Sequence, residues 1–294
     1  MLPSNFPGLP AGWKTEIETF RSADGAETLC WQKHTAPGAK KKRALLVLHG
    51  MGEHGGRYLH FTHYLKDEFD AIFCLDHRGH GRSGGIRGHV ARFDSMADDV
   101  ALAIKRIAES FSEIHLVAHS MGGQVALRAL FLHPELPLAS VSVSAPLMAI
   151  KVKVPAPKKI AAKVLNKIWG SLQLPTGVNA DVLSHDPEVA LCYRQDRLVH
   201  DKMTPAFFNG LEAAMADSLS RKKGILPPIQ FLVPLKDELV DPQTTIRFYE
   251  SLEHPAKRLK TYPDFFHESM NEVGKERFFD DVREWVIEHP ARST

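Results

Sequence analysis

The stretch Glu113-Ile-His-Leu-Val-Ala-His-Ser-Met-Gly-Gly123 decides the fold class, because it has the pattern of a buried strand, a sharp turn and a buried helix. Its apolar run ends abruptly at His119-Ser120, and a second apolar run, typical of a helix, follows the two glycines. A serine on such a turn holds its hydroxyl above the sheet edge, where the first N–H groups of the helix also point. Ser120 is therefore a candidate nucleophile, and a serine that merely caps the helix is the alternative.

Candidate strands recur on both sides of this stretch. They are Thr15–Phe20, Thr28–Lys33, Ala44–Leu48, Ala71–Leu75, Ile114–Ala118, Ala139–Val143, Ile229–Val233 and Arg258–Tyr262. The later strands are continuous apolar runs, as expected for parallel strands covered on both faces, and helical patterns lie between them. This alternation predicts an α/β fold with a mostly parallel, eight-stranded sheet and helices on both faces. The first two strands form a hairpin that extends one edge of the sheet.

The alternation breaks between Pro146 and about Lys223, where no strand is predicted. We therefore expect residues 1–145 and 224–294 to form a core and residues 146–223 to form an inserted helical cap, or lid.

The opening of this cap is basic, since residues 146–170 hold six lysines and no acidic residue. On a helix that starts near Pro157, one stripe is apolar (Ile160, Val164, Leu165, Ile168 and Trp169) and another is basic (Lys159, Lys163 and Lys167). A basic amphipathic helix is typical of a membrane-surface element. The alternative is an ordinary lid helix that packs its apolar face on the core, and the two are compatible.

The composition is that of an ordinary soluble protein, with 37 basic and 35 acidic residues among 294. This balance does not suggest nucleic-acid binding. No apolar stretch reaches membrane-spanning length, and the N-terminus lacks the pattern of a secretory signal. Cys30, Cys74 and Cys192 have no paired spacing, which predicts reduced thiols in a cytoplasmic protein.

A serine nucleophile needs a histidine base whose other ring nitrogen is held by a carboxylate. In this fold the chain order is serine, acid, histidine, so the acid should follow the strand Ile229–Val233. Three carboxylates are available there: Asp237, Glu238 and Asp241. Asp241 precedes Pro242 and a helical segment, which suits an N-cap, and Glu238 is expected to face away. We therefore predict Asp237 as the acid.

The base should follow the last strand and precede the last helix. His254 lies before that strand and His289 at the chain end, whereas His267 lies in the required interval. Two N–H donors should stabilise the oxyanion. We predict the backbone of Met121, after the nucleophile, and of Met51, in the glycine-rich loop that follows the third strand.

The same loop supports a competing hypothesis. Gly50-Met-Gly-Glu-His-Gly55 fits the dinucleotide pattern G-x-G-x-x-G, and Asp76 ends the next strand at a suitable distance. The preceding hairpin and His49, directly before the glycines, argue against a nucleotide site, which would also leave the serine, acid and histidine unexplained. The histidines of His77-Arg-Gly-His80 and His60-Phe-Thr-His63 lack the ligand set of a zinc site.

Several motifs resemble the monoacylglycerol lipase and lysophospholipase branch of the α/β-hydrolase superfamily, which is also described as serine aminopeptidase S33-like. They are His49-Gly-Met-Gly-Glu-His54, Asp76-His-Arg-Gly-His-Gly-Arg-Ser83, His119-Ser-Met-Gly-Gly123, Leu183-Ser-His-Asp-Pro-Glu-Val189 and Asp196-Arg-Leu-Val-His200. The resemblance covers most of the chain from about Lys14. The chain departs from the branch at Ala118, where glycine is usual, and in the basic opening of the cap.

The resemblance implies Ser120 as nucleophile, Asp237 as acid, His267 as base, and Met51 and Met121 as backbone oxyanion donors. It further implies a mobile lid over a hydrophobic acyl channel, with neither cofactor nor metal. Glu53, Arg57 and His119 would support the oxyanion loop.

We therefore expect a serine esterase that cleaves long-chain monoacylglycerols through an acyl-enzyme, with peripheral membrane contact through Lys151–Trp169. Lysophospholipase activity is the alternative, because a lysine-rich cap would suit an anionic phosphate head group. An aminopeptidase needs an acidic pocket for the free amine, and the cap sequence suggests none. A nucleotide-dependent oxidoreductase and a non-catalytic binding protein are the alternatives of other classes.

Overall fold

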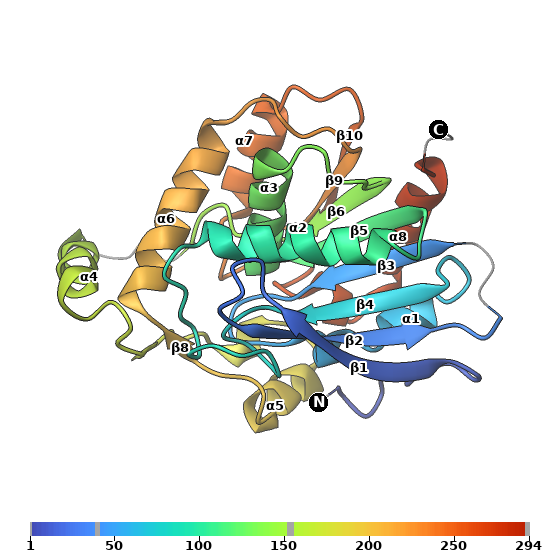
Figure 1. Cartoon of the computed structure of the whole chain (residues 1–294), viewed down its shortest axis with the longest axis horizontal. Helices are drawn as coiled ribbons and strands as arrows, with labels where there is room; N and C mark the ends of the chain where they lie inside the picture. The colour runs from blue at the N-terminus through green and yellow to red at the C-terminus, as the bar shows by residue number, and fades with distance from the viewer. Residues whose placement is uncertain (1, 39–41, 152–155, 292–294) are drawn as a thin grey trace.

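The structure is a computed structural model that describes residues 2–38, 42–151 and 156–291. Its centre is an eight-stranded sheet with the order β1-β2-β4-β3-β5-β6-β9-β10 (Figure 1). The strands are β1 (Lys14–Arg21), β2 (Thr28–Thr35), β3 (Arg43–Leu48), β4 (Ala71–Asp76), β5 (Glu113–His119), β6 (Ser140–Ser144), β9 (Ile229–Pro234) and β10 (Lys257–Tyr262). β2 pairs antiparallel with both β1 and β4, and every other pairing is parallel. The predicted fold class is therefore confirmed.

The helices connect these strands. They are α1 (Phe61–Tyr64), α2 (Asp94–Ala108), α3 (Met121–Leu132), α4 (Ala156–Trp169), α5 (Pro187–Gln195), α6 (Pro205–Ser220), α7 (Pro242–Ser251) and α8 (Glu276–Glu288), with the 3₁₀ turns η1 (Gly55–Tyr58), η2 (Ala180–Val182) and η3 (Ser269–Asn271). None of the described helices combines the length and the apolar character needed to cross a bilayer.

The central strands bury side chains on both faces of the sheet. In β3, Leu46 and Leu48 pack into the core that contains α2 and α3, whereas Leu45 and Val47 pack into the core that contains α1 and α8. Successive side chains of a strand point to opposite faces, so a strand that is covered on both sides reads as one unbroken apolar run. This is the physical reason for the pattern that predicted the sheet.

The segment between β6 and β9 holds α4, α5 and α6 and lies outside the eight-stranded sheet. The prediction that it contains no strand is wrong in one detail. Two short strands, β7 (Leu174–Pro175) and β8 (Lys202–Met203), pair antiparallel as a separate ribbon. Their two-residue length leaves no alternation that a sequence pattern could reveal.

Helix α4 lies at one edge of the molecule, beyond α6 (Figure 1). The alternative in which its apolar face packs on the core is wrong for Ile160, Val164 and Ile168, which are 63%, 53% and 79% exposed. Leu165, on another side of the helix, is half-buried. Residues 152–155 and the side chains of Lys158 and Lys159, part of the predicted basic segment, lie outside the described residues.

Candidate active site

Ser120 is the single residue that connects β5 to α3. Its backbone has φ 53° and ψ −118°, a conformation that L-residues avoid. The Ser120 side chain makes no capping hydrogen bond to α3, so the alternative in which it only caps the helix is wrong. The strain therefore serves to present the hydroxyl rather than to close the helix end.

The glycines after Ser120 allow α3 to approach the loop that follows β3. A Cβ atom at Gly122 would lie only 2.5 Å from the carbonyl oxygen of His49, and one at Gly123 would lie 2.9 Å from Cα of Pro146. Because any side chain at Gly122 would collide with backbone, only glycine lets the helix start so close to this loop. The two segments predicted to supply oxyanion donors are thereby brought together.

His267 lies between Ser120 and Asp237, on the loop after β10. Its Nε2 is 3.0 Å from Oγ of Ser120, and its Nδ1 is 2.7 Å from Oδ2 of Asp237. An ionised carboxylate only accepts hydrogen bonds, so Nδ1 carries the hydrogen and the Nε2 lone pair faces the serine hydroxyl. This arrangement can take a proton from Ser120.

Asp237 lies on the loop after β9 and is held by backbone as well as by His267. Its Oδ1 accepts hydrogen bonds from the amides of Leu239, at 2.8 Å, and Val240, at 3.0 Å. Burial alone would raise the pKa of this carboxyl, but His267 and the two backbone amides together outweigh burial, and the pKa is lowered. Asp237 is therefore ionised at neutral pH.

The two neighbouring carboxylates of Asp237 are placed elsewhere. Asp241 caps α7 by accepting a hydrogen bond from the amide of Gln243 at 3.1 Å. The side chain of Glu238 is 55% exposed and accepts a hydrogen bond from Lys151 Nζ at 3.0 Å. Lys151 also donates to the main-chain carbonyl of Asp237, a contact that sequence reasoning missed.

The pKa of the His267 imidazole is raised, although the group is buried. Burial disfavours the charged imidazolium, but the facing carboxylate of Asp237, together with the nearby carboxylates of Glu268 and Glu53, outweighs burial. The raised pKa lets His267 hold the serine proton during the reaction.

The predicted oxyanion donors, the amides of Met51 and Met121, belong to the two segments that meet beside Ser120. Met121 is the first residue of α3, so its N–H has no partner within the helix. Among the described residues, no side chain or carbonyl accepts a hydrogen bond from either amide. Both N–H groups are thus available to an oxygen atom bound at this position.

A cavity of about 550 Å³ opens beside Ser120 and His267. Its wall is mainly apolar and comes from the core and from the segment between β6 and β9. Residues of the second group include Ala162, Leu174, Val178, Met203, Phe208 and Leu211. Such a cavity suits a long apolar group whose polar end reaches the serine.

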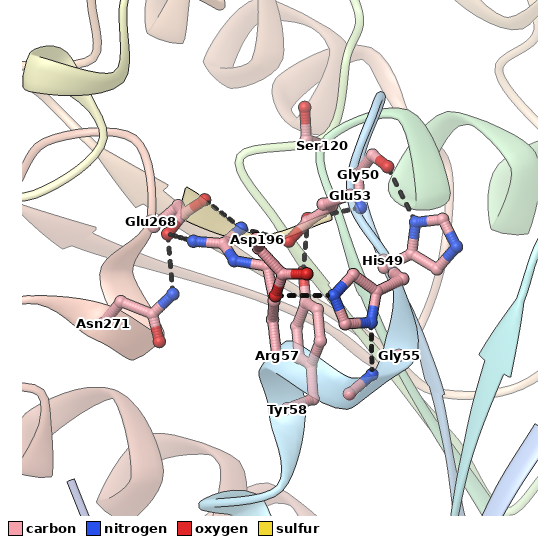
Figure 2. Close-up of polar contacts among 12 residues, drawn as sticks. His49, Gly50, Glu53, Gly55, Arg57, Tyr58, Ser120, Asp196, Glu268 and Asn271 are labelled. Atoms are coloured by element: carbon pink, nitrogen blue, oxygen red, sulfur yellow. Dashed lines mark hydrogen bonds and ion pairs between the residues drawn. The ribbon is translucent and has the colours of Figure 1, made fainter. Parts of the chain in front are cut away.

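A buried ionic cluster lies at the polar end of this cavity. Arg57 makes two 2.8 Å hydrogen bonds to Glu268 and also binds Glu53, and both carboxylates line the cavity (Figure 2). The hydroxyl of Tyr58 donates to Glu53 at 2.8 Å. Sequence reasoning anticipated Glu53 and Arg57 but missed Glu268, although it directly follows His267.

His119 lies beside the two carboxylates of this cluster, but the three residues are a poor metal site. Ligand atoms of Glu53, His119 and Glu268 lie within 4.8 Å of one another. Both carboxylates, however, are already bound to the Arg57 guanidinium, whose positive charge opposes a cation. Burial lowers the pKa of His119 to about 3, so the ring is neutral.

Asp76, the acidic residue that a dinucleotide site would need, already accepts hydrogen bonds from the protein backbone. Asp76 is buried and accepts hydrogen bonds from the amides of Gly55 and Arg82, each at 2.7 Å. A Cβ atom at Gly52 would meet the carbonyl oxygen of His200 at 2.3 Å, so protein backbone occupies the space beside the glycine loop. These contacts argue against a dinucleotide there.

The chain is similar to curated lipid hydrolases. It is 29% identical over 267 residues to a monoacylglycerol lipase from Mycolicibacterium smegmatis, covering 88% of this chain and 91% of the relative. It is 23% identical over 246 residues to phospholipase YtpA from Bacillus subtilis, covering 83% and 95%. Among solved structures, the monoacylglycerol lipase of Paleococcus ferrophilus superposes with a TM-score of 0.77 at 25% identity, covering 94% of this chain and 99% of the other.

The match to one protein family covers most of the chain. Residues 39–274, which include Ser120, Asp237 and His267, match the family described as serine aminopeptidase, S33. The chain therefore belongs to the serine aminopeptidase S33 family of the α/β-hydrolase superfamily, as its motifs predicted.

Proposed function

We propose that the protein hydrolyses the ester bond of long-chain monoacylglycerols, releasing a fatty acid and glycerol through an acyl-enzyme on Ser120. The coarser part of this statement, a carboxylic ester hydrolase, follows from the family and from the named lipases among its relatives. The observation that carries the proposal is the contact of Ser120 with the His267–Asp237 pair at the mouth of an apolar cavity.

The reaction begins with transfer of the Ser120 proton to Nε2 of His267, while Oγ attacks the ester carbonyl carbon. Asp237 stabilises the imidazolium that forms. The negative charge on the carbonyl oxygen is stabilised by the amides of Met51 and Met121. His267 then protonates the leaving glycerol oxygen, and the acyl group remains on Ser120.

Water repeats the sequence on the acyl-enzyme. His267 takes a proton from the water as it attacks, and returns that proton to Oγ of Ser120 as the fatty acid leaves. Both half-reactions use Nε2 of His267, the nitrogen that faces Ser120 in the resting protein.

The charge at the polar end of the cavity favours a neutral head group over a phosphate. Glu53 and Glu268 both line the cavity, and the single Arg57 between them is bound to both. Burial raises the pKa of Glu53, whereas Arg57 lowers that of Glu268 to about 2 despite its burial, so negative charge is retained there. An ionised phosphate offers these carboxylates no hydrogen to accept, whereas glycerol hydroxyls can donate to them.

Residues 146–223 act as the cap of this site. They supply much of the apolar wall of the cavity. The exposed apolar side chains of α4 do not line the cavity. Ile160, Val164 and Ile168 are exposed beside Lys163 and Lys167, which combines apolar insertion with attraction to anionic lipid. This face rests on a membrane while the cap admits the substrate.

Lysophospholipase activity is the second candidate, because a relative is named as a phospholipase. Purified protein should be assayed with monooleoylglycerol, with oleoyl lysophosphatidylcholine and with an amino-acid anilide. Monooleoylglycerol should be cleaved with the highest kcat/KM. A preference for the phospholipid would overturn the substrate, and a preference for the anilide would overturn the reaction class.

Ser120 is tested in the same assays. A fluorophosphonate should label the wild-type protein, and Ser120→Ala should abolish both labelling and ester hydrolysis. Full hydrolysis by Ser120→Ala would refute the acyl-enzyme mechanism.

A further inference from the structure

The peptide between Gly50 and Met51 carries the N–H that we assign to the oxyanion, so its orientation decides whether the hole exists. Gly50 has no side chain and can adopt many backbone conformations. Hydrogen bonds from the groups that flank Gly50 can hold this peptide in one orientation. The inference below concerns those hydrogen bonds and rests on the proposed function.

We propose that His49 is a positioning residue that fixes the Gly50–Met51 peptide and aims the Met51 amide at the developing oxyanion. Nδ1 of His49 lies 2.7 Å from the carbonyl oxygen of Gly50 (Figure 2). A carbonyl only accepts, so Nδ1 carries the hydrogen and donates it. Nε2 of the same ring accepts a hydrogen bond from the amide of His77 at 3.0 Å, which fixes this tautomer.

The geometry of the peptide bond turns this contact into control of the Met51 amide. A trans peptide is planar, and its carbonyl and N–H point in opposite directions. A donor that holds the Gly50 carbonyl therefore also holds the Met51 N–H. If the peptide rotated, His49 would lose its acceptor in a buried site.

The preceding peptide is held from its other side. The amide of Gly50 donates to Oε1 of Glu53 at 2.6 Å. Both backbone polar groups of Gly50 are thus bound by side chains, one from each flank of the loop (Figure 2). A Cβ atom at Gly50 would lie 3.2 Å from Cβ of Ser120, so this clamped backbone lies directly beside the nucleophile.

The surroundings of His49 keep its ring neutral. The side chain is fully buried, and its ring centroid lies 4.7 Å from that of His77 and 5.3 Å from that of His80. Burial and these neighbours lower the pKa of His49 well below its usual value. Nε2 therefore keeps the lone pair that accepts from the His77 amide throughout the pH range in which His267 acts as a base.

Substitution of His49 by Asn or by Gln tests the roles of its two ring nitrogens separately. The side-chain nitrogen of Asn reaches about the position of Nδ1, whereas the terminal amide of Gln reaches about that of Nε2. His49→Asn keeps a donor for the Gly50 carbonyl, and His49→Gln keeps only an acceptor for the His77 amide. Both variants lose one buried hydrogen bond, so similar losses in thermal stability are expected.

The expected result is a difference in kcat. His49→Gln should lower kcat by about 10²- to 10³-fold with little change in KM, as loss of an oxyanion donor does, and His49→Asn should recover most of the loss. A thionoester gives a second measure, because its sulfur fits an oxyanion hole poorly. The preference for the ordinary ester over the thionoester should fall at least about tenfold in His49→Gln and be retained in His49→Asn.

Equal losses of kcat in the two variants, in step with their melting temperatures, would overturn the proposal and leave His49 a purely structural residue. An unchanged ester preference in His49→Gln would also overturn it. If His49→Gln does not fold, His49→Leu serves as the variant without a donor. Failure of the proposed function is recognised separately, because it would appear as a wild-type protein without Ser120-dependent ester hydrolysis.

Discussion

The guanidinium of Arg57 binds the carboxylate of Glu268 through two hydrogen bonds of 2.8 Å, across 211 positions of sequence. Arg57 follows the loop that carries Met51, and Glu268 directly follows His267. The pair thus joins the oxyanion side of the site to the base side. Asn271 supports it by donating to Glu268 at 2.6 Å (Figure 2).

Glu268→Gln should destabilise the protein. Among the described residues, the substitution leaves Arg57 buried with Glu53 as its one remaining ion-pair partner. Removal of one member of a buried pair costs about 3–5 kcal/mol when no second partner remains. Because Glu53 remains, we expect a decrease of about 1–3 kcal/mol in the free energy of unfolding, measured by urea denaturation. The matched control is Asp264→Asn, which breaks a similar Arg277 pair that is exposed on both sides and should leave stability unchanged. Equal effects of the two substitutions would contradict the role assigned to the buried pair.

Asp237→Asn should lower kcat by about 10⁴-fold, because an amide permits the wrong histidine tautomer and does not stabilise the imidazolium. The matched control is Asp241→Asn, the same chemical change four residues along the same loop. Asp241 caps α7, and Asn caps a helix about as well as Asp, so activity and stability should both remain close to wild type. Steady-state kinetics of the two variants decide the matter, and a large loss in Asp241→Asn would show that the acid has been assigned to the wrong residue.

The pH dependence of kcat/KM should report His267. The base must be unprotonated to accept the serine proton, and despite burial the pKa of His267 is raised above 6.5, chiefly by Asp237 with Glu268 and Glu53. Activity should therefore increase with pH and reach half its maximum above pH 6.5. A rate of fluorophosphonate labelling measured over the same pH range should follow the same curve, since it depends on the same proton transfer. A midpoint below pH 6.5 in both measurements would be inconsistent with the His267–Asp237 contact.

Acid should unfold the protein through its buried histidines. Burial lowers the pKa of His60 to about 3, so His60 is neutral in the folded protein and takes up a proton on unfolding whenever the pH is below about 6.5. Stability attributable to His60 is thus complete above pH 6.5 and is lost as the pH falls. The neighbouring charges of Lys275 and Arg57 act in the same direction as burial, and Glu268 acts against it.

His60→Gln tests this dependence and keeps a donor for the Met270 carbonyl, which His60 Nε2 contacts at 3.1 Å. Between pH 7 and pH 4.5, the variant should lose about 2–3 kcal/mol less free energy of unfolding than the wild type. His63→Gln, at an exposed position of α1, the short helix that directly follows His60, should show the wild-type dependence. Parallel curves for the wild type and His60→Gln would contradict the assignment.

The sequence predicted the features that depend on local pattern. The unbroken apolar run of β3 predicted a strand covered on both faces, and the strained turn at Ser120 followed from its neighbouring glycines. The pairing of Arg57 with Glu268 could not be predicted, because it depends on how two distant loops meet at one edge of the sheet. The surroundings of α4 were likewise undecided, since an apolar stripe is the same whether a core or a membrane covers it.

The exposed face of α4 provides the last prediction. Ile168 is 79% exposed on a helix that also carries Lys163 and Lys167, and transfer of such a side chain into an apolar phase is worth about 1.5–3 kcal/mol. Ile168→Asp should therefore weaken binding to vesicles that contain phosphatidylserine by at least about tenfold in co-sedimentation, without changing hydrolysis of a short, water-soluble ester. The matched control is Ile287→Asp, where the isoleucine is 56% exposed on α8, a helix on the other side of the molecule from α4 (Figure 1). If α4 lies on the membrane, the control should bind vesicles like the wild type, and equal loss of binding in both variants would show that exposed apolar area in general, rather than this helix face, makes the contact.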